Sequence, residues 1–360
     1  CGVEVRHVRH GVGGTGFRVE TSKGTIAAQN IVAATGPFQK PVIPPVLPAL
    51  DGVTQMHSSA YRNPDQLEPG AVMVVGATYG VDRTVLLAFW AFETDYGAFQ
   101  GDFNTANALA TLAHDSVVRG TTSRPQVLAA MQLHAADDFD PRTTTGAWAG
   151  EIGMVQMLPM DIIENGVDAD GDGHVSLKTS APDALTSGGK MLHHLGWQAG
   201  QPWLQEVNVP ASMDWSQSGL DTVMPATDWQ ALGVAARNGT LADLPASLIL
   251  PQGHKGPAFL AYPNFNVYFE WNQSFTYVLT AAYFATRLGG APVYDAGTPD
   301  AGLDSNQMKQ LQQRLSDKGY DVGKIDGILG SGTRAAVQAE QERLGLPADA
   351  WPTPALLNQL

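Results

Sequence analysis

One carboxyl group in the sequence has the surroundings that a general acid requires. Glu93 follows Leu86 by seven residues and Phe89 by four, so in a helix it shares their apolar face. A carboxyl group on such a face loses contact with water, which raises its pKa and lets it hold a proton near neutral pH. The spacing therefore favours Glu93 as a catalytic acid. A surface glutamate at the end of the helix is the alternative, and spacing alone leaves it open.

A second set of carboxylates has the spacing of a calcium-binding loop. Asp168, Asp170 and Asp172 alternate along the chain, and Gly173 follows them, as at positions 1, 3, 5 and 6 of an EF-hand loop. His174, at position 7, would offer its backbone carbonyl oxygen to the ion. The loop contains no acid–base candidate of its own, so we expect a structural calcium site. A solvated acidic turn is the alternative.

The helix that carries Glu93 is expected over residues 79–97. Asp82 is a suitable N-cap because its carboxylate accepts hydrogen bonds from the unpaired N–H groups of the first turn. Gly97 is a suitable stop because glycine adopts the left-handed conformation that ends many helices.

The sequence on the two sides of this helix shows two different secondary-structure patterns. From residue 81 onwards the apolar residues recur at helical spacing, so we expect the chain to be mainly α. Residues 1–77 instead favour β-structure, including a buried parallel strand at residues 71–77. Shorter strands are expected at residues 17–20, 25–27 and 31–33.

The composition excludes several classes of protein. Of the 360 residues, 44% are hydrophobic and 16% are charged, so the chain is neither disordered nor a coiled coil overall. The net charge is −14, which argues against binding along a nucleic-acid backbone, and residues 78–304 alone carry −15. The single cysteine, Cys1, excludes an intrachain disulfide bond and a cysteine-based zinc site. No apolar run reaches the roughly 18 residues that a membrane helix needs.

The N-terminal segment resembles part of a flavin-dependent monooxygenase through residues 34–38 (ATGPF) and 74–77 (VVGA). This resemblance implies an α/β, flavoprotein-like fold for residues 1–77. A dinucleotide site needs Gly-x-Gly-x-x-Gly between a strand and a helix. Residues 76–80 (GATYG) have only two glycines at another spacing, and the glycines of residues 11–16 precede a strand, as in a hairpin turn. We therefore expect a non-functional fragment without flavin, and a flavin monooxygenase is the third hypothesis for function.

Several ordered motifs within residues 78–290 resemble the lytic murein transglycosylase B family. In chain order they are residues 92–97 (FETDYG), 107–113 (NALATLA), 146–159 (GAWAGEIGMVQMLP), 167–174 (VDADGDGH), 194–197 (HLGW) and 272–277 (NQSFTY). The resemblance implies a lysozyme-like, α-rich catalytic domain. It also implies cleavage of the β-1,4 bond between N-acetylmuramic acid and N-acetylglucosamine in peptidoglycan, with formation of a 1,6-anhydromuramoyl end.

The family resemblance implies a role for each matching residue. Glu93 would protonate the glycosidic oxygen and then take the proton of the C6 hydroxyl that attacks C1. One carboxyl group suffices for this route, whereas ordinary glycosidases need a pair. Gln156, Asn272 and Tyr277 match positions that bind the substrate.

Two further features complete the set of candidate site residues. Trp148 is a candidate for stacking on a sugar face, as are Trp203, Trp215 and Trp271, and Arg119 is a candidate for substrate contact. The resemblance also implies that a later aspartate closes the calcium loop. The expected metal ligands are then Asp168, Asp170, Asp172, His174 and Asp183.

The sequence departs from the family pattern at two places. Ala147 stands where the family commonly has serine, and Val118-Arg119 stands where it has two adjacent arginines. Both changes affect expected substrate contacts. The alternative hypothesis is therefore a non-catalytic peptidoglycan-binding protein with a decayed cleft.

Residues 305–360 resemble peptidoglycan-binding domain type 1, through residues 311–315 (LQQRL), 319–330 (GYDVGKIDGILG) and 333–337 (TRAAV). The resemblance implies a small three-helix module with Asp326-Gly327 in a connecting turn. Such a module would raise the local concentration of the catalytic domain on the polymer. The expected organisation is thus residues 1–77, 78–290, 291–304 as a Gly/Pro/Asp-rich linker, and 305–360.

The resemblances also imply a partner and a location. The partner would be the glycan strands of peptidoglycan, with no nucleic acid and no membrane span. The location would be the periplasm or cell envelope, with the export signal expected to be missing by truncation. We expect a monomer.

Overall fold

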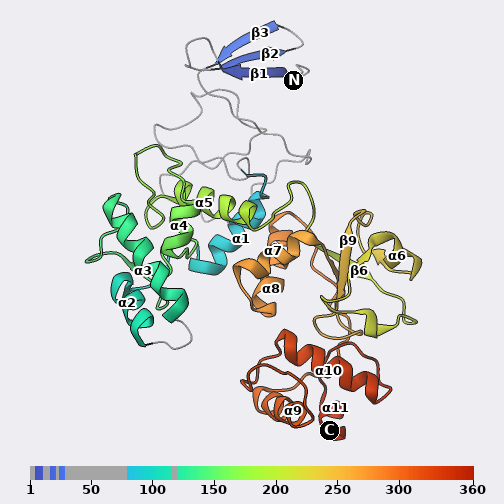
Figure 1. Cartoon of the computed structure of the whole chain (residues 1–360). Helices are drawn as coiled ribbons and strands as arrows, with labels where there is room; N and C mark the ends of the chain where they lie inside the picture. Colours follow the sequence, from blue (N-terminus) through green and yellow to red (C-terminus); the bar gives the residue numbers. More distant parts are fainter. Residues whose placement is uncertain (1–4, 11–16, 22–23, 29–78, 116–119) are drawn as a thin grey trace. The chain divides into compact units, whose positions relative to one another are not determined.

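The computed structural model describes residues 5–10, 17–21, 24–28, 79–115 and 120–360. The chain divides into two compact units, residues 1–77 and 78–360. The elements of each unit are labelled in Figure 1.

The described part of the first unit is an antiparallel sheet in the order β1–β2–β3. Its strands are β1 (Val5–His10), β2 (Phe17–Thr21) and β3 (Gly24–Ala28). This confirms the strands expected at residues 17–20 and 25–27. The expected strands at 31–33 and 71–77, and the residues that carry the flavoprotein resemblance, lie outside the described part.

The second unit begins with helices, in agreement with the mainly α fold that the sequence predicts. These helices are α1 (Arg83–Thr94), α2 (Thr105–Asp115), α3 (Gly120–Ala135), α4 (Pro159–Asn165) and α5 (Ala181–His194). Two more, α7 (Pro263–Trp271) and α8 (Phe275–Leu288), follow a small sheet. Helix α1 contacts both α5 and α8, and α7 contacts α8 (Figure 1). Strands β4 (Phe103–Asn104) and β5 (Thr145–Gly146) form a separate antiparallel pair.

Helix α1 has the N-cap that the sequence predicts, but it is shorter at both ends than the expected range of residues 79–97. The side chain of Asp82 accepts a hydrogen bond of 2.8 Å from the backbone N–H of Thr84, so Asp82 is the N-cap. The helix ends at Thr94 because Asp95 adopts the left-handed conformation, with φ of 49°. Gly97 also has a positive φ, but it lies beyond the end of the helix. Glu93 is therefore in the last turn.

An antiparallel five-stranded sheet in the order β7–β9–β10–β6–β8 lies between α5 and α7 in the chain. The strands are β6 (Leu204–Asn208), β7 (Met224–Pro225), β8 (Ala235–Ala236), β9 (Pro245–Ile249) and β10 (Phe259–Ala261). The sheet packs with α6 (Ala226–Ala231) around a core that includes Trp229, Leu248 and Leu260. A short 3-10 helix, Trp215–Gln217, precedes β7. The sequence did not predict this sheet.

The C-terminal residues form the expected three-helix module, with α9 (Ser305–Asp317), α10 (Ser331–Arg343) and α11 (Pro354–Gln359). Its core contains Leu311, Leu315 and Val337, none of which is exposed. Gly327 lies in the turn between α9 and α10, has φ of 84° and donates its N–H to the buried side chain of Gln312. A residue with a side chain is strained at that φ, so glycine suits this turn.

Residues 291–304 contain no helix or strand, yet their backbone is bound to the sheet region. The N–H of Asp295 donates to Glu206 at 2.7 Å, and the N–H of Thr298 donates to the carbonyl of Lys255 at 2.8 Å. The Lys255 ammonium also pairs with Asp300 at 2.8 Å. The segment that was expected to be a linker is therefore held against the sheet region by hydrogen bonds and an ion pair.

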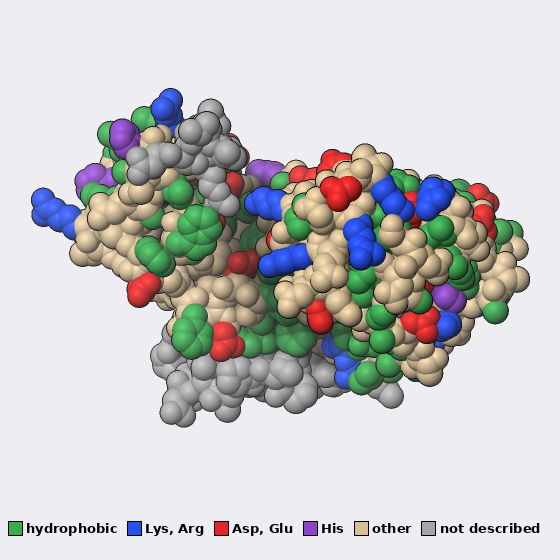
Figure 2. Space-filling model, turned by 90° about the horizontal axis from the view of Figure 1, so that it is seen from below, with side chains coloured by type: hydrophobic (Ala, Val, Ile, Leu, Met, Phe, Trp, Pro, Cys, Tyr) green, Lys and Arg blue, Asp and Glu red, His purple; other side chains and the backbone are tan. Residues whose placement is uncertain are grey.

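The surface seen in Figure 2 is hollowed between two lobes, and hydrophobic and acidic side chains are visible within the hollow. Lysine and arginine side chains gather on the larger lobe in this view. Within the described residues, no helix is long and apolar enough to cross a membrane.

Candidate active site

Glu93 accepts two hydrogen bonds on the same carboxylate oxygen. The hydroxyl of Tyr277 donates to Oε1 at 2.5 Å, and the indole N–H of Trp271 donates to Oε1 at 2.9 Å. Tyr277 lies in the first turn of α8 and Trp271 is the last residue of α7. Three helices therefore place their side chains at one carboxyl group, and the hydrogen bonds leave Oε2 of Glu93 without a partner among the described residues.

Aromatic packing holds these helices together around Glu93. Phe89 of α1 stacks on Tyr268 with ring centroids 4.9 Å apart and contacts the ring of Trp271 at 4.6 Å. Phe92 meets the ring of Tyr277 edge-on at 5.7 Å. Since aromatic rings of this size bury large apolar areas, the contacts fix the directions from which both donors approach.

The electrostatics of the site raise the pKa of Glu93. Burial raises the pKa of the Glu93 carboxyl above its ordinary value of 4.5, the hydrogen bonds from Tyr277 and Trp271 lower it, and the negative charge of Glu151 raises it. The balance is upward, as expected for a general acid that must carry a proton. Burial and the charge of Glu93 raise the pKa of Tyr277 well above its ordinary value, so its hydroxyl remains a donor.

The segment that carries Glu151 and Gln156 is bound to the end of α1. The hydroxyl of Thr94 donates to the carbonyl of Met154 at 2.7 Å, and the side-chain amide of Gln156 donates to the carbonyls of Gly153 and Gln100 at 2.7 and 3.3 Å. Gln156 has φ of 52°, an uncommon conformation for a residue with a side chain. Its amide N–H groups thus hold this turn together.

Glu151 is a residue that the sequence reasoning missed. One of its carboxylate oxygens, Oε2, is buried and has no hydrogen-bond partner among the described residues. Its charge acts on Glu93, as described above. The apolar spacing that identified Glu93 could not find Glu151, because Glu151 lies in a loop and not on a helix face.

The remaining substrate-binding candidates are distributed around this site. Asn272 is the C-cap of α7, and its side chain accepts the N–H of Ser274, so it shapes the turn between α7 and α8. Trp148 has 56% of its surface exposed. The backbone N–H of Ala147 donates to the carbonyl of Glu151 at 2.9 Å. Arg119 lies outside the described residues.

The other tryptophan candidates have partners within the fold. Trp203 donates its indole N–H to the carbonyl of Ala282 in α8, and Trp215 packs its ring against His254 at 5.1 Å. Trp271 was a candidate for sugar stacking, whereas the structure places its N–H on Glu93. That role depends on a residue 178 positions away and has no local sequence signal.

The acidic loop brings three of its expected ligands together. Ligand oxygens of Asp168, Asp170 and Asp172 all lie within 4.8 Å of one another, as the coordination of one divalent cation requires. Asp183 is fully buried, and its two oxygens accept the N–H groups of Ala169 and Ser176 at 2.9 Å each. Asp183 thus holds the two sides of the loop together.

The side chain of His174 contacts Asp138 and is not part of the group of three aspartates. Its Nδ1 lies 3.1 Å from Asp138, and that hydrogen bond raises the pKa of the imidazole. Its backbone N–H donates to Asp172 at 2.8 Å. The expected contribution of His174 to the ion was a backbone carbonyl, so this side-chain contact leaves that expectation as it was.

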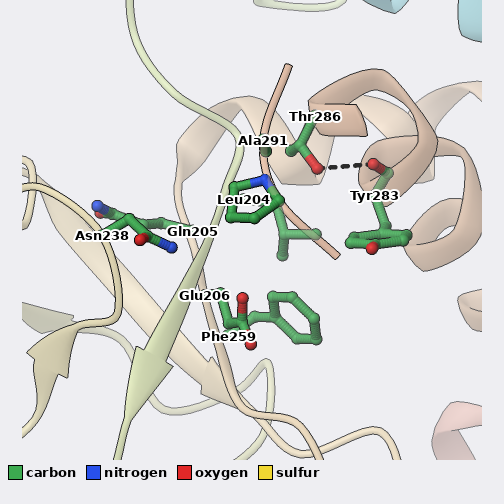
Figure 3. A pocket seen from close by; sticks show the side chains of 9 residues that line it. Leu204, Gln205, Glu206, Asn238, Phe259, Tyr283, Thr286 and Ala291 are labelled. Carbon is green, nitrogen blue, oxygen red and sulfur yellow. Dashed lines mark hydrogen bonds between the residues drawn. The ribbon is translucent and has the colours of Figure 1, made fainter. Parts of the chain in front are cut away.

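A small pocket of about 150 Å³ lies between β6 and α8 (Figure 3). Its one acidic side chain, Glu206, accepts from the Arg237 guanidinium and from the N–H of Asp295, both at 2.7 Å. The other lining residues are neutral, among them Phe259 and Tyr283. Because Glu206 is already paired, this pocket offers no acid for catalysis.

Comparison with known families supports the resemblances seen in the sequence. The model of the transglycosylase SLT domain matches residues 68–286, and the model of a putative peptidoglycan binding domain matches residues 304–360. The model of a pyridine nucleotide-disulphide oxidoreductase matches residues 2–84.

Two solved structures share most of this chain. They are crystal structures of SltB3 from Pseudomonas aeruginosa in complex with NAG-anhNAM-pentapeptide and with NAG-NAM-pentapeptide. Each is 38% identical and covers 79% of this chain and 77% of its own, with TM-scores of 0.71 and 0.70. This similarity confirms the expected lysozyme-like, α-rich fold.

Curated relatives match separate parts of the chain. The membrane-bound lytic murein transglycosylase B of Escherichia coli is 25% identical over 202 residues, which are 56% of this chain and 55% of that protein. An uncharacterized CzcO-like oxidoreductase of Geobacillus kaustophilus is 55% identical over 62 residues, which are 17% of this chain and 18% of that protein. The chain therefore spans about half the length of the one relative and less than a fifth of the other.

Proposed function

We propose, because the chain belongs to the transglycosylase SLT domain family, that it is a lytic transglycosylase of peptidoglycan with Glu93 as its catalytic acid and base. The observation that carries this proposal is the pair of hydrogen bonds from Tyr277 and Trp271 to one oxygen of a carboxyl group whose pKa burial raises. The similarity to SltB3, which was solved in complex with NAG-anhNAM-pentapeptide and with NAG-NAM-pentapeptide, supports peptidoglycan as the substrate.

We assign different roles to the two oxygens of Glu93. Oε1 accepts from Tyr277 and Trp271, so Oε2 is the oxygen that carries the proton to the substrate. Transfer of this proton to the glycosidic oxygen breaks the bond between C1 of N-acetylmuramic acid and the leaving sugar. Glu93 is then a carboxylate, and the two donors stabilise its charge.

The second half of the reaction returns the proton to Glu93. The C6 hydroxyl of the same N-acetylmuramic acid attacks C1 and gives its proton to Oε2, which forms the 1,6-anhydro ring and restores the acid. No water is consumed. A raised pKa suits both halves, since Glu93 must be protonated at the start and basic enough to take a proton at the end.

The supporting residues act beside this carboxyl group. We assign substrate binding to Gln156, Asn272, Tyr277, Trp148 and Arg119. Gln156 and Asn272 shape the two turns next to Glu93, since their side chains bond the backbone of those turns.

The acidic loop is proposed as a structural calcium site. Asp168, Asp170 and Asp172 supply closely spaced oxygen ligands, which is the donor chemistry that calcium prefers. His174 would add its backbone carbonyl, and Asp183 would close the loop. The bound ion would offset the mutual repulsion of the three carboxylates.

The arrangement of domains supports a role at the cell wall. Residues 78–290 are proposed as the catalytic domain and residues 305–360 as the module that binds peptidoglycan, joined by residues 291–304. We propose that the protein acts in the periplasm or cell envelope, where this substrate lies, and that it is a monomer. Residues 1–77 are proposed as a flavoprotein-like fragment without a role in this activity.

One experiment tests the function directly. Purified protein and its Glu93→Gln variant are incubated with peptidoglycan, and the soluble products are analysed by mass spectrometry. We expect 1,6-anhydromuramoyl products from the unaltered protein and none from the variant, which keeps the shape of the side chain but has no acidic proton.

Two outcomes would contradict the proposal. Products with a free reducing end would indicate hydrolysis, and products formed by Glu93→Gln would exclude Glu93 as the acid. Absence of products together with co-sedimentation with sacculi would support the non-catalytic binding protein instead.

A further inference from the structure

The C-terminal module contacts the helix that carries Tyr277. The guanidinium carbon of Arg334, in α10, lies 4.6 Å from the centre of the Phe275 ring. The Nη2 group of Arg334 also donates to the carbonyl of Pro251 at 2.9 Å. Phe275 is the first residue of α8 and only 7% of its surface is exposed. A cation from the module thus rests on a residue two positions before Tyr277.

The contacts continue from Phe275 to the catalytic carboxyl group. The N-cap Ser274 accepts the backbone N–H of Tyr277, whose hydroxyl donates to Glu93. The ring of Phe275 also faces the ring of Phe269 in α7, with centroids 6.4 Å apart. Helix α7 ends in Trp271, the second donor to Glu93. Phe275 therefore lies where the two helices that carry both donors meet.

A buried arginine such as Arg334 carries a desolvation penalty that a contact joining two domains does not require. Burial lowers its pKa to about 10, although the nearby Asp349 raises it, and the side chain is still charged at neutral pH. Its Nε is buried without a hydrogen-bond partner among the described residues. An apolar side chain would fill such a space without the desolvation penalty of a charge. What the charge adds is a directional attraction to the face of the Phe275 ring.

We propose that Arg334 is a positioning residue of the active site, which holds Phe275 and thereby the start of α8 in the place that directs Tyr277 onto Glu93. The inference rests on the proposed transglycosylase function. It means that the C-terminal module takes part in the geometry of the reaction, in addition to holding the protein on the polymer. A module that only tethers would affect insoluble sacculi and leave the turnover of a short soluble glycan unchanged.

Variants of the full chain test this on soluble, uncross-linked glycan oligomers. Arg334→Met removes the cation and keeps an apolar stem, while Arg334→Lys keeps a cation without the planar guanidinium. The matched control is Arg343→Met, on the same helix, where the side chain is 55% exposed and pairs with Glu340 inside the module. We expect Arg334→Met to lower kcat about tenfold, since small misplacements of catalytic groups reduce rates strongly. KM should change less than about twofold, Arg334→Lys should recover part of kcat, and the control should retain it.

Two further variants distinguish a specific effect on the Arg334–Phe275 contact from a general loss of structure. Phe275→Leu should reproduce the loss of kcat, and the double variant with Arg334→Met should lose no more than either single variant, because both act through one contact. Full additivity, or a kcat of Arg334→Met within about twofold of the unaltered protein, would overturn the proposal. If Arg334→Met does not fold, Arg334→Lys and Phe275→Leu decide by the same criteria.

A titration without substrate separates this inference from the proposed function. Trp271 donates to Glu93, so tryptophan fluorescence should change as Glu93 ionises. The part of the pH-dependent change that is absent from Glu93→Gln is assigned to Glu93. A weaker bond from Tyr277 raises the pKa of Glu93, so the midpoint should move to higher pH in Arg334→Met and remain in place in Arg343→Met. An unmoved midpoint would overturn the positioning role even if the protein forms no anhydromuramoyl product.

Discussion

The hydroxyl of Tyr277 lies 2.5 Å from Oε1 of Glu93, although the two residues are 184 positions apart in the chain. This contact joins the last turn of α1 to the first turn of α8, and the indole of Trp271 reaches the same oxygen from α7. Burial raises the pKa of this carboxyl group, and the two hydrogen bonds lower it.

Removal of the Tyr277 hydroxyl should change the pH dependence of the reaction. A hydrogen bond to the ionised form of a carboxyl group lowers its pKa, so Tyr277→Phe should raise the pKa of Glu93. The alkaline limb of the pH–rate profile should shift to higher pH by roughly half a pH unit or more. The maximal rate should fall about tenfold. Tyr283→Phe, on the same helix but bonded to the N–H of Tyr294, is the control. A limb that stays in place would show that the hydroxyl does not act on Glu93.

Removal of the Glu151 charge should move the same limb in the opposite direction. The charge of Glu151 raises the pKa of Glu93, so Glu151→Gln should lower it and shift the alkaline limb to lower pH by roughly half a unit. Glutamine keeps the shape of the side chain and an acceptor oxygen. The exposed Glu164 of α4 provides the control variant Glu164→Gln. Coincident profiles for the two variants would rule out an electrostatic role for Glu151.

Replacement of Glu93, the proposed catalytic acid, should stabilise the protein at neutral pH. The pKa of Glu93 is above 4.5 in the folded state, so between 4.5 and that value the native state holds a proton that the unfolded chain has released. The corresponding stabilisation is full below pH 4.5 and is lost as the pH rises through the folded pKa. Glu93→Gln removes this dependence and still accepts both hydrogen bonds.

Thermal unfolding at two pH values tests this prediction. We expect the Tm of Glu93→Gln to exceed that of the unaltered protein by about 1–4 °C at pH 7.5. The difference should shrink at about pH 4, where Glu93 is protonated in the folded state and largely so in the unfolded chain. An equal difference at both pH values would contradict the linkage. A Tm of Glu93→Gln below that of the unaltered protein at pH 7.5 would contradict the upward shift of the Glu93 pKa.

Calcium should raise the unfolding temperature through the acidic loop. A ligand that binds only the native state stabilises it by about 2.7 kcal/mol at a hundredfold excess over its Kd. We therefore expect a higher Tm in calcium than in chelator for the unaltered protein and for Asp221→Asn, a control at an exposed aspartate outside the loop. Asp170→Asn should abolish the difference. Equal Tm values for the unaltered protein in calcium and in chelator would exclude the calcium site.

Local spacing was sufficient to identify several features from the sequence alone. The positions of Leu86 and Phe89 predict the helix face that holds Glu93, and Asp82 predicts the start of that helix. The alternation of Asp168, Asp170 and Asp172 predicts their grouping. These features could be predicted because each depends on residues within about two helical turns or one loop.

Only the tertiary structure decided what surrounds the carboxyl group. Trp271 and Tyr277 reach Glu93 through the packing of α1, α7 and α8, and Arg334 reaches Phe275 through the docking of a separate module. The five-stranded sheet also escaped prediction, because its strands have two to five residues and pair across long stretches of chain. Helical periodicity determines which face of α1 is buried, but the side chains that meet that face depend on how distant segments pack. The sequence therefore determined where Glu93 lies on its helix, and the packing determined the partners that shift its pKa.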